Sequence, residues 1–324
     1  MMSKRTTTPP KLETLSLQAF PALKIGHEQD ETAKTGCTVI LCTNQAGATG
    51  GVDVRGGAPG TRESDLLRPE NTIEKIHGII LSGGSAFGLD AAGGVMQFLE
   101  EQGIGFDVGV TKVPIVPQAV LFDLTYGDWR IRPNQAMAYR ACVKAFKAVP
   151  WEDGSIGAGT GATVGKIRGM EYAMKGGLGS ACFKIGSLYV GALVAVNAVG
   201  DIVQPSTGKI LAGALADDHQ TFLNTEEYIL KTNYQKPVTF SRENTTIGLI
   251  MTNGRLTKAE ANKLATMTHD AYARTIRPVH TLHDGDTIFT MATNEVDTNL
   301  DFLGVLAVRA MEQAILNSVN AITK

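Results

Sequence analysis

The chain has 324 residues, 43% of them hydrophobic and 19% charged, and its formal net charge at pH 7 is −2. This composition is typical of a soluble globular protein, and the near-neutral charge excludes strong electrostatic attraction to nucleic acid or to an anionic membrane. No window holds about 18 consecutive apolar residues, and the first 20 residues lack the apolar core of a signal peptide. We therefore expect a cytoplasmic protein without a membrane span, and we predict that the first 20 residues form a tail.

The first half of the chain predicts short strands and amphipathic helices joined by glycine-rich turns. GCTVILC, residues 36–42, has the pattern of a short buried strand, and residues 52–55 form a second strand after a glycine-rich loop. Residues 77–103 predict a strand, a glycine turn and a helix, because the apolar residues after the turn keep helical spacing. Extended segments follow within residues 104–124, and residues 132–149 predict an amphipathic helix.

The second half begins with apolar strands punctuated by glycine over residues 155–203. A helix is predicted near residues 206–216. The polar stretch 217–243 has no clear period and is predicted to be a surface connection. Farther on, Thr257 and Glu260 form a capping-box signature that marks the start of a helix.

Strands of near-continuous hydrophobicity and helices are mixed along the whole chain. This pattern predicts sheets whose outer faces are covered by helices. No internal repeat or low-complexity tract divides the chain, so a single domain over residues 1–324 is predicted. The four cysteines lie in apolar segments without a CxxC pair, which predicts buried, reduced thiols and neither a zinc nor a redox site. They are Cys37, Cys42, Cys142 and Cys182.

Two glycine-rich stretches lie where a phosphate could bind, GGSAFG at residues 83–88 and GSIGAGTGATVGK at residues 154–166. Their spacing fits neither GxGxxG nor GxxxxGK[ST], and the first stretch lacks the lysine of a P-loop. Tight packing of the turns is the better interpretation of both.

Two carboxylates, Asp284 and Asp286, lie two residues apart ahead of the strand TIFTMAT. On an extended backbone, residues i and i+2 face the same way, so both carboxylates would point at one place and the pKa of one would rise. A solvated Asp-Gly turn is the better interpretation of this pattern when it is taken alone. His280 and His283 lie nearby, but their spacing matches no standard zinc pattern.

Lys166 and Asn197 are polar residues within glycine-rich or apolar runs. Burial of a lysine or an asparagine is costly unless the side chain has hydrogen-bond partners. Either residue could lie at a strand end in water. The eight residues before Asn197 are apolar or glycine, so burial and a hydrogen-bonding role are predicted for this side chain.

Two threonines, Thr245 and Thr246, stand at the start of the strand predicted by TTIGLIMTN. A hydroxyl is a weak nucleophile without a base, and the chain has no GxSxG elbow. Cleavage just before a threonine supplies a base, because the freed α-amino group, with a reference pKa of about 7.7–8.0, is partly neutral near neutral pH. The strand and the polar segment upstream meet the needs of this mechanism, although β-propensity is the simpler explanation of a Thr-Thr pair.

Several motifs in consistent order, from about residue 25 to the C-terminal helix, resemble the DmpA-type aminopeptidase family. Within this family they are most similar to the nylon-oligomer hydrolases of the NylC type. The motifs are VDVRGGAPG, LSGGSAFGLDAAGGV, AVLFDL, GAGTGATVGK, KGGLGSA, VAVNAVGDI, ENTTIGLIMTN and HDGDTIFTMATNEVD. The resemblance implies an α/β fold, namely the αββα four-layer sandwich of N-terminal-nucleophile hydrolases and of the ornithine acetyltransferases.

The resemblance also implies self-cleavage between Asn244 and Thr245, which makes Thr245 the N-terminal nucleophile. The products would be an α chain, residues 1–244, and a β chain, residues 245–324, which remain associated. Thr246 would point to the opposite face of the strand and have a structural role.

The same resemblance implies catalytic roles for four further residues. Asp284 and Asp286 would orient the threonine and handle protons. Lys166 matches the active-site lysine of the family, whose positive charge would offset the two carboxylates and lower the pKa of the Thr245 amine. Asn197 matches the asparagine that donates to the carbonyl oxygen as negative charge develops.

One position departs from the family pattern. Phe122, in AVLFDL, stands at a substrate-binding position where the characterised nylon hydrolase has tyrosine, so one hydroxyl is missing. Tyr126 lies four residues later, and nothing in the sequence indicates that it replaces this hydroxyl. Either the hydroxyl is dispensable or the substrate preference differs.

The implied reaction is hydrolysis of linear amides through an acyl-enzyme, without a metal or an organic cofactor. The expected substrates are 6-aminohexanoate oligomers, similar ω-amino-acid amides or short peptides. Three alternatives stay open: an aminopeptidase that releases N-terminal β-, D- or L-aminoacyl residues, an acyltransferase that uses an amine acceptor, and a non-catalytic binding protein. By resemblance we expect a homotetramer of processed protomers, with no nucleic-acid or membrane partner.

Overall fold

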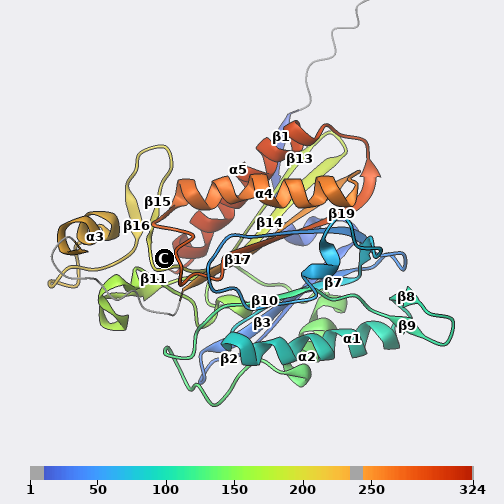
Figure 1. Ribbon diagram of the computed structural model, residues 1–324, viewed down its shortest axis with the longest axis horizontal. Helices are drawn as coiled ribbons and strands as arrows, with labels where there is room; N and C mark the ends of the chain where they lie inside the picture. Colours follow the sequence, from blue (N-terminus) through green and yellow to red (C-terminus); the bar gives the residue numbers. More distant parts are fainter. Residues whose placement is uncertain (1–10, 234–243, 323–324) are drawn as a thin grey trace, which may run out of the picture.

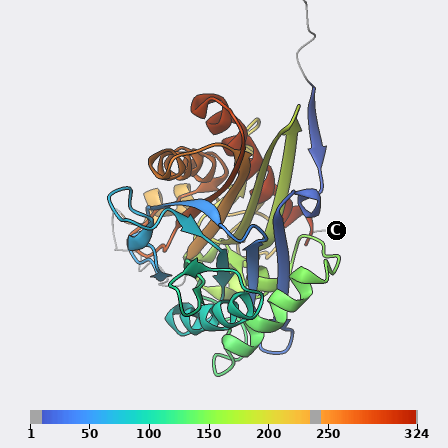
Figure 2. The same ribbon diagram turned by 90° about the vertical axis from the view of Figure 1, so that its right-hand side faces the viewer.

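The computed structural model describes residues 11–233 and 244–322. Two β-sheets pack face to face, and helices cover both outer faces (Figure 1, Figure 2). Helices α4 and α5 lie against the larger sheet, whereas α1 and α2 lie against the smaller one. The order of the layers is therefore helix, sheet, sheet, helix, as predicted. The covering helices are α1 (Ala92–Glu101), α2 (Gln135–Phe146), α4 (Lys258–Thr275) and α5 (Leu300–Asn320).

The larger sheet has seven strands in the order β1-β13-β14-β17-β19-β4-β6. Its strands are β1 (Leu12–Leu15), β13 (Gly177–Ile185), β14 (Leu188–Asn197), β17 (Thr245–Gly254), β19 (Thr287–Val296), β4 (Ala48–Val54) and β6 (Lys75–Ile76). The central strand β17 is antiparallel to β14 and parallel to β19. Pairing with β14 includes Thr245, the first residue of β17, whereas pairing with β19 begins at Ile247.

The smaller sheet has five strands in the order β2-β3-β7-β10-β5. They are β2 (Leu23–Asp30), β3 (Thr35–Cys42), β7 (Gly78–Ser82), β10 (Gln118–Val120) and β5 (Thr61–Arg62). Besides short 3-10 turns, the described residues form three short sheets and one further α-helix. These elements are β15 (Asp201–Val203), β16 (Ile210–Ala212), β18 (Ile276–Arg277), β11 (Thr163–Val164), β12 (Met174–Lys175), β8 (Phe106–Asp107), β9 (Lys112–Val113) and α3 (Thr225–Asn233). Helix α3 lies beside β15 and β16 at the left of Figure 1.

The side chains of β17 alternate between two hydrophobic cores. Ile247 and Leu249 lie in the core between the sheets, whereas Ile250 packs in the core beneath α4 and α5. The same alternation directs Thr245 toward the side between the sheets and Thr246 toward the helices. The prediction that the two threonines face opposite ways is therefore confirmed.

Most predicted elements of the central chain are present. The pattern at residues 36–42 forms β3, and the helix predicted within 132–149 is α2. Helix α4 begins with the predicted capping box, because Thr257 and Glu260 exchange their side-chain and backbone hydrogen bonds. The four cysteines are buried and free, as predicted.

In the second half, one prediction is wrong and another, that of a surface connection, is incomplete. Residues near 206–216 form no helix, because Gly208 adopts a left-handed φ of 70° and residues 210–212 pair with β15 as β16. The stretch 217–243 contains helix α3, whose first residue, Thr225, donates through its backbone N–H and its hydroxyl to the buried carboxylate of Asp201. Asn224 Oδ1 also accepts from the Glu227 N–H at 3.2 Å, so the start of this helix combines a local cap with a carboxylate that is distant in sequence. Residues 234–243 lie outside the described part of the chain.

The predicted N-terminal tail is also wrong over the described residues. Strand β1 pairs with β13 at the edge of the larger sheet. Leu17 and Phe20 are only 3% and 4% exposed and belong to the core between the sheets. Residues 1–10 lie outside the described part of the chain, so the prediction is not tested there.

Helix α5 is long and apolar enough to cross a membrane by length and composition alone. However, 67% of its most apolar window is buried inside the molecule, and the helix packs on β13 and β14. Packing against the sheet therefore accounts for its hydrophobicity.

Candidate active site

Three strand ends meet at one end of the larger sheet. Asn197, the last residue of β14, is the register partner of Thr245, the first residue of β17. One residue earlier, Asn244 forms a β-bridge with Asp284, just ahead of β19. The pairing of these strands therefore brings together residues that are far apart in the sequence.

The Thr245 hydroxyl lies against the peptide bond that precedes it. Thr245 is 5% exposed, and its Oγ1 donates to the carbonyl oxygen of Asn244. The backbone N–H of Gly285 donates to Thr245 Oγ1 at 3.1 Å and to the Asn244 carbonyl oxygen at 3.3 Å. A Cβ at Gly285 would lie 2.8 Å from Thr245 Oγ1, so a glycine suits this position best. The N–H of Gly285 is thus aimed at the oxygen on which negative charge would develop during attack on this carbonyl.

Lys166 supplies a buried positive charge beside Asn197. Its side chain is 1% exposed, and Nζ donates to the backbone oxygen of Asn197 at 3.0 Å and to Asn197 Oδ1 at 2.8 Å. Lys166 follows Gly165, whose left-handed φ of 72° and contact with the Ala214 backbone exclude a side chain. Burial raises the pKa of Asp284, and the charge of Lys166 partly opposes this rise. The burial that the sequence left open for Lys166 is therefore observed.

The Asn197 amide is fully buried and held from both ends, as predicted. Its Oδ1 accepts from the Thr163 backbone N–H at 2.9 Å as well as from Lys166, and its Nδ2 donates to the Phe122 carbonyl oxygen at 2.8 Å. These partners fix which end of the amide is the donor, because Lys166 can only donate and a carbonyl can only accept. The N–H₂ end therefore faces the segment that contains Phe122.

Asp284 and Asp286 are 2% and 1% exposed, so they are not part of a solvated turn. Asp284 Oδ2 accepts from the Thr281 backbone N–H at 2.5 Å. Asp286 Oδ1 accepts from the Thr246 N–H at 2.7 Å, and its Oδ2 accepts from His280. Burial, followed by the neighbouring Asp286 carboxylate, raises the pKa of Asp284 to about 6.

The raised pKa of Asp284 predicts a pH-dependent stability change. Below the unfolded pKa of about 3.8 both states are protonated, so the raised pKa has no effect on stability. Between pH 4 and 6 Asp284 ionises in the unfolded state before it ionises in the folded state, and above pH 6 the buried charge destabilises the folded state by roughly 3 kcal/mol. We expect Asp284→Asn to raise the free energy of unfolding by up to that amount at pH 7.5 and to leave it unchanged at pH 3.5.

Chemical denaturation of Thr245→Ala and of the double variant Thr245→Ala/Asp284→Asn would measure this difference without interference from self-cleavage. Asparagine keeps the oxygen that accepts from Thr281. A double variant that is less stable at pH 7.5 would contradict the raised pKa.

A pocket of about 170 Å³ opens beside the Thr245 hydroxyl. Its walls come from the loop after β4, the turn after β7 and the end of β10. The lining residues are Ala58, Pro59, Gly60, Ser85, Ala86, Val120, Leu121, Phe122, Asn244, Thr245 and His283. Phe122, for which the family resemblance implies a substrate-binding position, is one of these lining residues. Tyr126 is not among these lining residues, and its ring lies 5.7 Å from Lys175 Nζ.

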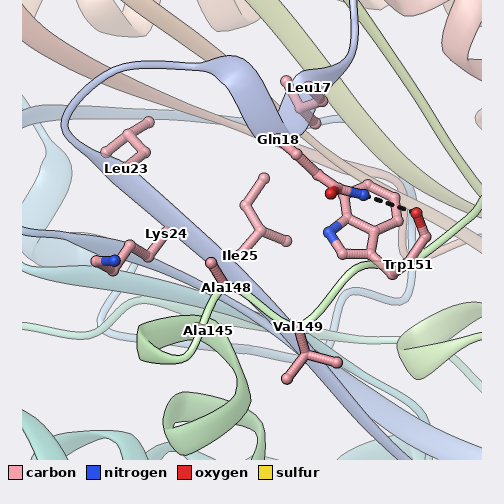
Figure 3. Close-up of a pocket in the computed structure, with 9 residues that line it drawn as sticks. All are labelled: Leu17, Gln18, Leu23, Lys24, Ile25, Ala145, Ala148, Val149 and Trp151. Atoms are coloured by element: carbon pink, nitrogen blue, oxygen red, sulfur yellow. Dashed lines mark hydrogen bonds between the residues drawn. The ribbon is translucent and has the colours of Figure 1, made fainter.

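A second hollow, of about 110 Å³, lies between β2 and the segment that follows α2 (Figure 3). Leu23, Ile25 and Val149 give it apolar walls, and Gln18 Nε2 donates to the Trp151 carbonyl oxygen at its edge. None of the nine lining residues carries a hydroxyl, a thiol or a carboxylate. This hollow therefore lacks a nucleophile for hydrolysis.

Thr163 and Asp123 support the site but were not predicted from the sequence. Thr163 orients Asn197, as described above. Asp123 is 4% exposed and accepts from the Gly84 backbone N–H and from Thr35 Oγ1, both at 2.7 Å. It therefore helps to fix the glycine turn after β7. A carboxylate inside the apolar run AVLFDL was a usable signal for Asp123, whereas the role of Thr163 depends on its backbone.

A family model, described as peptidase family S58, matches residues 17–324 of this chain. An uncharacterized aminopeptidase of Mycobacterium leprae is 41% identical over 292 residues, which cover 87% of this chain and 79% of that protein. A 6-aminohexanoate-oligomer endohydrolase of Kocuria sp. strain KY2 is 32% identical over 324 residues, which cover 94% of this chain and 86% of that protein.

Solved structures with the same fold include the L-aminopeptidase D-Ala-esterase/amidase of Ochrobactrum anthropi, described as a variant of the Ntn hydrolase fold. It superposes with a TM-score of 0.66 at 16% identity and covers 93% of this chain and 85% of its own. A Burkholderia sp. β-aminopeptidase gives a TM-score of 0.63 at 20% identity, with 96% of this chain and 87% of that chain covered. The predicted N-terminal-nucleophile-like sandwich is therefore confirmed.

Proposed function

This chain belongs to peptidase family S58 and is a hydrolase of amide bonds, and we propose that it cleaves itself before Thr245 and then uses Thr245 as its nucleophile. The observation that carries the proposal is the contact of Thr245 Oγ1 with the carbonyl group of Asn244. The buried Lys166, Asn197 and Asp284 surround this contact. A hydroxyl held against its own preceding carbonyl is the arrangement that an N-to-O acyl shift requires.

Self-cleavage begins when Thr245 Oγ1 attacks the carbonyl carbon of Asn244. The C–O bond forms, the C–N bond to Thr245 breaks, and the nitrogen takes up the proton that the hydroxyl loses. Water then hydrolyses the ester between Asn244 and Thr245 and leaves a carboxylate and a free α-amine. The N–H of Gly285, which already donates to the Asn244 carbonyl oxygen, stabilises the negative charge on that oxygen.

Turnover repeats this chemistry on a substrate. The α-amine of Thr245 takes the proton from Oγ1, which attacks the substrate carbonyl, and Asn197 Nδ2 donates to the oxyanion. The amine product leaves with a proton, an ester to Thr245 remains, and water releases the acid. The positive charge of Lys166 favours the neutral form of the α-amine, which is the form that acts as a base.

The pocket supports linear ω-amino-acid amides, such as 6-aminohexanoate oligomers, as substrates. Seven of the eleven described lining residues are apolar or glycine and none is Asp or Glu, so a substrate ammonium group would meet no carboxylate there. Methylene chains suit such walls better than charged groups do. Phe122 extends the apolar surface where a tyrosine would place a hydroxyl.

An aminopeptidase activity is the second candidate, because the Mycobacterium leprae relative, at 41% identity, is named an aminopeptidase. Product analysis separates the two candidates. Release of internal fragments from a 6-aminohexanoate oligomer supports the first, whereas release of single residues from the N-terminus of β- or α-peptides supports the second. Product that forms only after an acceptor amine is added would indicate acyl transfer instead.

The first test is intact-mass spectrometry of the purified protein. We expect two polypeptides, of 244 residues and of 324 − 244 = 80 residues, with threonine at the new N-terminus. A single uncut chain that hydrolyses amides would contradict the proposal, because the hydroxyl would then have no α-amine as its base.

A further inference from the structure

His280 lies in the loop between β18 and β19 and contacts Asp286 twice. Its backbone N–H donates to Asp286 Oδ2 at 3.1 Å, and its ring Nδ1 lies 2.8 Å from the same oxygen. Because a carboxylate only accepts hydrogen bonds, the ring donates through Nδ1. The two side chains are 18% and 2% exposed, so this hydrogen bond is shielded from water.

The other oxygen of Asp286 reaches the nucleophile's strand. Asp286 Oδ1 accepts from the Thr246 backbone N–H at 2.7 Å, which belongs to the peptide that directly follows Thr245. Thus one oxygen of Asp286 is held by His280, and the other holds the first peptide of β17. Any rotation of this carboxylate would move the residue that carries the reacting hydroxyl and amine.

The His280 ring is itself fixed by α4. Its centroid lies 4.9 Å from that of His269 and 6.0 Å from that of Tyr272. Burial lowers the pKa of His269 to about 4, so this neighbour is neutral near pH 7, and its Nε2 lies 3.0 Å from the Asp53 carbonyl oxygen. The rings of His269 and Tyr272 therefore hold the His280 ring with its Nδ1 directed at Asp286.

We infer that His280 is a positioning residue that holds the Asp286 carboxylate, and through it the first peptide of β17, in the geometry that catalysis requires. This inference rests on the proposed function, because it concerns the Thr245 site. A role of the ring in packing alone is the competing explanation. The two explanations differ in one respect: positioning needs the N–H at Nδ1, whereas packing needs only the volume of the ring.

The backbone at His280 decides which variants test this difference. Its φ of 58° is left-handed, a conformation that glycine and asparagine tolerate better than other residues. His280→Gly removes the ring donor, keeps the backbone N–H that binds Asp286 and introduces no backbone strain. His280→Asn also removes the ring, but its amide nitrogen can reach the position of Nδ1 and donate. His219→Asn is a matched control, because His219 also has a left-handed φ, of 52°, and is exposed, with its ring stacked on Tyr172.

The experiment measures processing by intact mass, and then kcat and KM on the amide oligomer that the wild type hydrolyses. We expect His280→Gly to lower kcat about 100-fold, the usual cost of misplacing a reacting group by about 1 Å, with KM unchanged. His280→Asn should recover most of the lost kcat, and His219→Asn should match the wild type. Recovery by asparagine identifies the hydrogen bond as the cause, because asparagine does not restore the ring.

Two results would overturn the inference: wild-type kcat in His280→Gly, or a kcat in His280→Asn as low as that of the glycine variant. If the glycine variant does not fold, the asparagine variant decides alone, since retained kcat supports the hydrogen bond and lost kcat contradicts it. An active wild type with unaffected His280 variants would reject only this inference. An uncut or inactive wild type would reject the proposed function and this inference with it.

Discussion

Thr245→Ala will give a single intact polypeptide without amidase activity. The substitution removes Oγ1, the atom that contacts the Asn244 carbonyl, so neither the acyl shift nor acyl-enzyme formation has a nucleophile. A denaturing gel and intact-mass spectrometry would detect the uncut chain, and an amide hydrolysis assay would detect the loss of activity. The expected loss is complete within the limit of the assay.

Two variants serve as controls for this result. Thr245→Ser keeps a hydroxyl and should still be cleaved and active. Thr246→Val keeps the branched shape and the N–H that Asp286 binds, so it should also be cleaved and active. A Thr245→Ala protein that is still cut at residue 244, or that still hydrolyses amides, would show that another group is the nucleophile.

Asn197→Ala should lower kcat by about 10² to 10³, the usual effect of the loss of one oxyanion donor. The structure adds a second consequence, because the substitution also removes the Oδ1 that accepts from Lys166 and Thr163. A slower self-cleavage is therefore expected as well. Single-turnover and steady-state kinetics of the mature protein would separate the two effects.

Asn197→Asp distinguishes the role of the amide oxygen from that of the amide nitrogen. It keeps an oxygen for Lys166 and for the Thr163 N–H, but it cannot donate to an oxyanion. We expect it to lose as much kcat as the alanine variant. If Asn197→Asp retained the wild-type rate, the donor role of Asn197 would be excluded.

The sequence was most informative where a local pattern and the tertiary structure agree. β17 begins at Thr245 as predicted, because a run of apolar β-formers follows the threonines, and α4 begins at its capping box. Where an element depends on contacts with residues distant in sequence, the sequence pattern did not predict that element. Strand β1 forms because it pairs with β13. The first residue of α3 donates to a carboxylate that lies 24 residues earlier in the chain.

In the candidate site, too, some residues were found from sequence patterns, whereas others depend on the tertiary structure. Its side chains were identified from motifs and from a family resemblance, and the strand register explains why they meet. Gly285, Thr163 and His280 were not assigned a role, because they act through backbone N–H groups or through a loop whose path the sequence does not reveal. Gly285 and Thr163 contribute backbone N–H groups, so their residue types give little indication of the role, and the contact of the His280 ring with Asp286 depends on the path of the loop.

The position of β17 and β19 between β14 and β4 determines what a nick at residue 244 would do to the molecule. The short fragment would supply two interior strands and helices α4 and α5, and the long fragment would supply the strands on either side of them. Dissociation of the fragments would break the hydrogen bonds between β14 and β17 and between β4 and β19. Separation of the fragments should therefore require unfolding, and the nicked molecule should melt in a single transition whose midpoint rises with protein concentration, because unfolding releases two polypeptides.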